Sequence, residues 1–120
     1  MALPAAITMS RGRVLDLSGP YYYQDMLTGI AEEILNELAE IEKVDLPSLA
    51  EEDFEQVVSV TQIRLLNELY YCLGQLRAAG IERDLKRAIQ DLRDIWNRLI
   101  EGTGRPPALK FQTEGEEQVQ

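Results

Sequence analysis

The 120-residue chain contains no histidine and a single cysteine, Cys72. Without histidine it cannot build a Ser-His-Asp or Cys-His nucleophile, nor a zinc site of the usual Cys/His kind. One cysteine cannot form an intramolecular disulfide. The sequence also lacks any run of about 18 apolar residues, so it predicts no membrane-spanning segment. We therefore expect a non-catalytic protein without a metal or cofactor and without a membrane partner.

The N-terminus lacks the pattern of a secretory signal. Residues 1–19 have no positive start before an apolar stretch, and Pro4 and Thr8 interrupt the one candidate run. A lone cysteine fits a reducing compartment. These features predict a cytoplasmic protein.

What the sequence does have is apolar residues at helical spacing. A first helix is predicted to begin after Pro20 and to end at Asp45-Leu46-Pro47, and its apolar stripe is Met26, Ile30, Ile34, Leu38 and Ile41. Ser48 with Glu51, and again Ser59 with Gln62, have the spacing of a capping box. They predict a short helix through residues 54–58 and a separate one from Ser59 to Gly80. The apolar stripe of that separate helix is Ile63, Leu66, Leu69, Tyr70, Leu73 and Leu76.

A last helix is predicted over residues 85–101, where Gly102 ends it. The fold class is therefore all-α, a small bundle of three or four helices over residues 20–102 with disordered termini. We expect residues 1–19 to be irregular and residues 103–120 to form a flexible acidic tail. Arg13–Leu17 has the composition of a short extended piece, but no partner strand is predicted for it.

Charge is divided along the chain. Residues 1–57 hold 12 acidic and 3 basic residues, whereas residues 58–112 hold 9 basic and 6 acidic ones. On the last helix, Lys86, Gln90, Arg93 and Asn97 share one polar face without an acid. One interpretation is that Lys86 and Arg93 contact phosphates. The other is an ordinary solvated helix face.

Four further features each have two interpretations. Cys72 is expected to be a buried, inert thiol rather than a reactive one. The Tyr21–Tyr23 run favours an anchor for a helix start over a platform for stacked bases. The acids Glu32, Glu33, Glu37 and Glu40 predict a solvated face, or one that docks a basic partner. Gly74 inside a helix indicates either the close approach of another helix or mere tolerance, at about 1 kcal/mol relative to alanine.

The segment beginning at Val58 resembles the small, all-helical subunit of type III CRISPR effector complexes. Ser59, Thr61, Gln62, Ile63 and Arg64 match its Thr/Ser run, polar residue, apolar residue and arginine in order. A weaker similarity to the same subunit lies in the amphipathic helix that leads to residues 102–105.

The resemblance implies an antiviral ribonucleoprotein in which copies of the subunit hold the guide–target duplex or the displaced strand by its backbone. Arg64 would carry over as a backbone contact, and the charge layout adds Lys86, Arg93 and Arg105 as candidate nucleic-acid contacts. The implied partners are other subunits of the assembly and RNA, and self-association is left open.

Two other classes compete with this hypothesis. Residues 69–96 are loosely similar to the last helices of flagellin-export chaperones, which bind a helix of a partner protein in an apolar groove. A helical adaptor that docks a basic protein on its acidic N-terminal half is the third. Oligomeric state, the nature of the bound partner, and the roles of the tyrosine run and the tail are not determined by the sequence.

Overall fold

The computed structural model describes residues 3–105, which confirm the predicted small all-helical bundle. In chain order, the elements are β1 (Ala6–Thr8), β2 (Val14–Asp16), α1 (Tyr22–Asn36), a π-helical turn (Glu37–Ile41), a 3-10 turn (Leu46–Ser48), α2 (Glu51–Ala78) and α3 (Leu85–Gly102). Residues 106–120 of the predicted tail lie outside the described residues. Among the described part of that tail, Arg105 donates hydrogen bonds to the carbonyl oxygens of Leu46 and Leu49, so the end of this range is held against the bundle.

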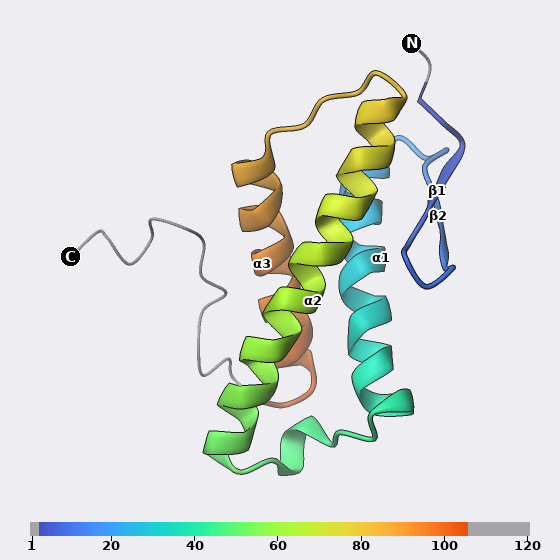
Figure 1. Ribbon diagram of the computed structural model, residues 1–120. Helices are drawn as coiled ribbons and strands as arrows, with labels where there is room; N and C mark the ends of the chain where they lie inside the picture. The colour runs from blue at the N-terminus through green and yellow to red at the C-terminus, as the bar shows by residue number, and fades with distance from the viewer. Residues whose placement is uncertain (1–2, 106–120) are drawn as a thin grey trace, which may run out of the picture.

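The three helices pack around one core. Figure 1 shows α2 running opposite in direction to α1 and α3 and crossing in front of both. Helix α3 makes its most extensive contacts with α1 and touches α2 only sparsely. The largest fully buried side chains come from all three helices and from the N-terminal hairpin: Met9, Leu17, Met26, Leu27, Ile30, Ile34, Phe54, Leu65, Leu69, Leu76 and Leu92.

The prediction of an irregular N-terminus without strand pairing was wrong. β1 and β2 form an antiparallel hairpin in which Ile7 faces Leu15, and both of these side chains are buried. β2 packs against α1 and β1 against α2, so the hairpin covers one side of the bundle. A Cβ at Gly29 of α1 would lie 2.7 Å from Leu15 Cδ2, which shows how closely the hairpin approaches that helix. The strands are too short to give a readable alternation, and the helices supply their stability.

The predicted break before Ser59 is also wrong, because α2 is continuous from Glu51 to Ala78. Ser48 does not cap it; its hydroxyl donates to Asp45 instead, and the residue before the helix is Ala50. A Ser followed three residues later by Gln fits a helix interior as well as a helix start, so the spacing alone does not separate the two.

The predicted end of this helix is confirmed. The predicted last helix is present, but it includes Gly102, and the glycine with a left-handed φ after it is Gly104. Gly80 adopts a φ of 87°, in the left-handed region, just after α2. Asp84 caps α3 by accepting a hydrogen bond from the backbone N–H of Lys86. Over residues 3–105, none of the helices combines the length and hydropathy needed to cross a membrane.

Candidate interaction surface

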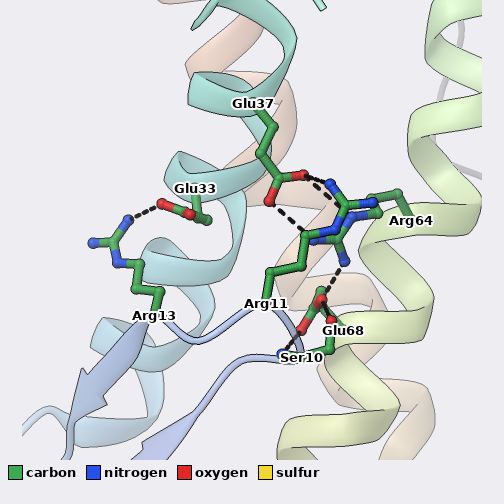
Figure 2. Close-up of polar contacts among 7 residues, drawn as sticks. All are labelled: Ser10, Arg11, Arg13, Glu33, Glu37, Arg64 and Glu68. Atoms are coloured by element: carbon green, nitrogen blue, oxygen red, sulfur yellow. Dashed lines mark hydrogen bonds and ion pairs between the residues drawn. The ribbon is translucent and has the colours of Figure 1, made fainter. Parts of the chain in front are cut away.

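Arg64, the residue that carries the resemblance, lies in an ion-pair network rather than on a cationic surface. Its Nε and Nη2 donate to the two oxygens of Glu37 at 3.2 and 2.9 Å, and its Nη1 donates to Glu68 (Figure 2). The Arg64 side chain is 19% exposed, and Glu68 beneath it is 1% exposed. Two carboxylates therefore neutralise this guanidinium.

The same network fastens the hairpin to the helices. Ser10 donates to Glu68 through its backbone N–H and its hydroxyl, and Arg11 donates to Glu37 at 3.1 Å (Figure 2). Burial would raise the pKa of Glu68, but the hydrogen bonds from Ser10 and Arg64 outweigh it and hold that pKa below its ordinary value. Burial would lower the pKa of Arg64, but its two carboxylate partners outweigh burial and raise that pKa above its ordinary value. The predicted solvated acidic face is thus wrong for Glu37, which is buried and paired.

The structure does not bring the four candidate nucleic-acid contacts together. Arg105 lies past the end of α3, where it stacks 4.2 Å from the ring centre of Phe54 and pairs with Glu51. Arg93 is 17% exposed and lies 4.0 Å from Asp94. Lys86 is exposed at the opposite end of α3, and no ion pair is found for it within residues 3–105. A continuous cationic patch is not formed by these four side chains.

The tyrosine run anchors the start of α1 instead of presenting a stacked surface. Tyr23 donates to Asp91 of α3 at 2.8 Å, and Arg83 lies over its ring at 3.8 Å. Burial, followed by the hydrogen bond and charge of Asp91, raises the pKa of Tyr23 to about 12. Tyr21 points into solvent. The run therefore ties α1 to α3.

Cys72 is fully buried in α2, as predicted. Burial, with a smaller contribution from the charge of Glu68, raises the pKa of its thiol to about 12. A thiol this far from ionisation is a poor nucleophile. Among the described residues, no group of three or more acidic or cysteine side chains is placed to hold a metal ion.

Helix α2 has a second apolar face that points into solvent. Its inner face contributes Phe54, Leu65 and Leu69 to the core. On its outer face, Val60 and Ile63 are 61% and 63% exposed, and Tyr70 and Tyr71 about half. The structure describes every residue of α2, and none of the exposed ones between Glu55 and Arg77 is charged. We call the outer row of Val60, Ile63, Asn67, Tyr70 and Gly74 the α2 stripe.

A hollow lies at each end of the α2 stripe. Beside Val60, a hollow of about 380 Å³ opens between α2 and the π-helical turn, with Leu38 and Val57 among its apolar lining and Gln56 and Glu42 among its polar lining. Beside Tyr70 and Gly74, a smaller hollow of about 210 Å³ reaches Leu85 at the start of α3. Both are open to solvent and adjoin the stripe, and charged side chains as well as apolar ones line them.

The sequence analysis placed Ile63 and Tyr70 in the core, and this was wrong. The buried face contains Thr61, Leu65 and Glu68 instead. The available signal was that large apolar residues fall on more than one face of α2, since Val60 and Ile63 lie outside the row of Leu65 and Leu69. A helix of that kind is typically covered on a second side.

Comparisons with family models, with curated protein sequences and with solved structures found no match.

Proposed function

We propose that this protein is a non-catalytic interaction subunit that docks a protein helix on the α2 stripe. The observation that carries the proposal is the exposure of Val60, Ile63 and Tyr70 on a helix face without charge. Contiguous exposed apolar side chains on a small protein mark sites of protein contact. The residues of the α2 stripe are three and four positions apart, which is the spacing by which one helix packs against another.

The polar contacts support protein docking over nucleic-acid binding. Arg64 and Arg105 are engaged with carboxylates or carbonyl oxygens of the same chain. Breaking the Arg64 network to bind a phosphate would leave Glu37 and Glu68 buried without their cation. No such rearrangement is needed for a helix to cover the α2 stripe.

The test is the native size of the protein in its host. The tagged chain should elute in an assembly larger than the 13.6 kDa monomer, and Ile63→Asp should return it to monomer size. Val14→Asp is the matched control, because Val14 is also 63% exposed but lies on the hairpin. Nuclease treatment should leave the assembly intact. A wild-type chain that elutes as a monomer, or an assembly indifferent to Ile63→Asp, would overturn the proposal.

The RNA-binding subunit of a CRISPR-type effector is the second candidate. It is supported by the arginines Arg83, Arg87 and Arg98, which line one hollow of about 450 Å³ between α1 and α3 together with Asp91. If these arginines contact the phosphate backbone of RNA, the affinity for RNA should fall steeply as the salt concentration rises.

This candidate is tested with single-stranded and duplex RNA. Lys86→Glu and Arg98→Glu should weaken binding, and Arg77→Glu, at the other helix, serves as the control. Arg64→Glu is unsuitable because it would disrupt the fold. Absent binding, or binding unaffected by salt and by both substitutions, would remove the RNA hypothesis.

A further inference from the structure

One row of exposed positions on α2 keeps a regular spacing from one end of the helix to the other. Successive steps of three and four residues lead through Asp53, Gln56, Val60, Ile63, Asn67, Tyr70, Gly74 and Arg77, all of them exposed. Alternating steps of three and four are the seam of a two-helix coiled coil. The seam extends beyond the α2 stripe at both ends and has a charged residue only at each end.

When two copies of α2 are placed antiparallel, their seams are complementary in shape. Pairing α2 with an antiparallel copy about an axis level with Leu65 places Tyr70 against Val60. It also places Gln56 against Gly74. In both pairs a longer side chain meets a smaller one, as close packing of facing positions requires. Ile63 and Asn67 face each other at the centre.

The charges on α2 also favour an antiparallel copy. Its exposed acids Glu51, Glu52, Asp53 and Glu55 all lie in the first turns, and its exposed base, Arg77, lies in the last turn. A parallel copy would set the acidic turns against each other. An antiparallel copy sets Asp53 of each chain against Arg77 of the other, and it also opposes the two helix dipoles.

The two hollows fit the same arrangement. The half-exposed Tyr70 of one copy reaches the level of Val60 on the other, beside the 380 Å³ hollow, whose lining combines apolar side chains such as Leu38 with polar and charged ones such as Gln56 and Glu42. A tyrosine ring with its hydroxyl at the rim suits such a site. At Gly74, nothing among residues 3–105 lies within 4 Å of a Cβ at that position, so the backbone there leaves room for a neighbouring helix.

We propose that the helix docked on the α2 stripe is α2 of a second copy of this chain, packed antiparallel in a symmetric dimer. The inference rests on the proposed function and names its partner. One helix pair gives an interface at the small end of the usual range, so we expect a dissociation constant of about 1–100 µM.

Sedimentation equilibrium of the purified chain from about 1 µM to 1 mM tests the dimer. Mass should rise from 13.6 kDa to twice that value. Ile63→Asp and Tyr70→Asp should remain monomeric throughout while keeping wild-type helicity by circular dichroism. Val14→Asp should dimerise like the wild type. A wild-type chain that stays monomeric at the highest concentration would overturn the inference.

A charge exchange tests the direction of the pairing. Asp53→Arg alone and Arg77→Asp alone should each raise the dissociation constant about threefold to tenfold, because each sets like charges together. The double variant should return it to the wild-type value. In a parallel dimer Asp53→Arg would instead relieve acid repulsion, and tighter binding by that variant would refute the antiparallel arrangement.

The two proposals fail separately. If the purified chain is monomeric but the native assembly still disperses with Ile63→Asp, the stripe binds a different protein and only the second-copy inference falls. If neither the purified chain nor the native assembly responds to Ile63→Asp, the docking surface itself is refuted.

Discussion

Replacing Arg64 by leucine should destabilise the fold strongly at neutral pH. The change removes the cation shared by Glu37 and Glu68, which are 5% and 1% exposed. Removing one partner of a buried ion pair typically costs about 3–5 kcal/mol. We expect the low end, about 3 kcal/mol, because Arg11 still contacts Glu37 and Ser10 still donates to Glu68. The midpoint of thermal unfolding should fall by about 15 °C.

The loss should depend on pH in a defined direction. The pKa of Glu68 in the folded wild type is lowered from 4.5, so its stabilising effect is present above that value and disappears as pH falls through the folded pKa. The difference in urea unfolding between wild type and Arg64→Leu should therefore be largest at pH 7 and should shrink at acid pH, below 4.5.

Two further variants sharpen this test. Arg87→Leu breaks an ion pair with Asp91 that is largely in solvent, and should cost about 0.5 kcal/mol or less. Adding Glu37→Gln and Glu68→Gln to Arg64→Leu should recover much of the lost stability, because no charge then remains buried. A loss below about 1 kcal/mol, or one equal at neutral and acid pH, would refute the assignment of Arg64 as a structural cation.

Three further predictions follow from buried groups and from backbone space. Cys72 should react with a thiol reagent only on unfolding, since its pKa is raised to about 12; fast labelling of native protein at pH 8 would contradict its burial. Tyr23 should ionise near pH 12 in an ultraviolet titration, and Tyr23→Phe should remove that transition. Gly29→Ala should destabilise the fold by about 1–3 kcal/mol, because its Cβ would meet Leu15 at 2.7 Å. Gly74→Ala, with open space around it, should stabilise the monomer by up to about 1 kcal/mol; equal effects of the two alanines in urea unfolding would contradict the close approach of the hairpin.

Local signals predicted the elements whose causes are local. The end of α2 depends on Gly80, a left-handed glycine whose effect is set by a few neighbouring residues. The inert state of Cys72 also followed from its neighbours in the chain. The hairpin did not, because its three-residue strands are stable only where α1 and α2 cover Ile7 and Leu15.

The candidate site shows the same division. The sequence by itself determined that the protein is a helical bundle without histidine chemistry. Only the tertiary structure decided which face of α2 is buried and which basic side chains form ion pairs within the chain. Arg64 pairs with Glu37, which lies 27 positions earlier in the sequence, and residue spacing does not predict such a contact. Burial and ion pairing depend on what lies opposite a side chain in space, and the three-dimensional packing of α1, α2 and the hairpin fixes that.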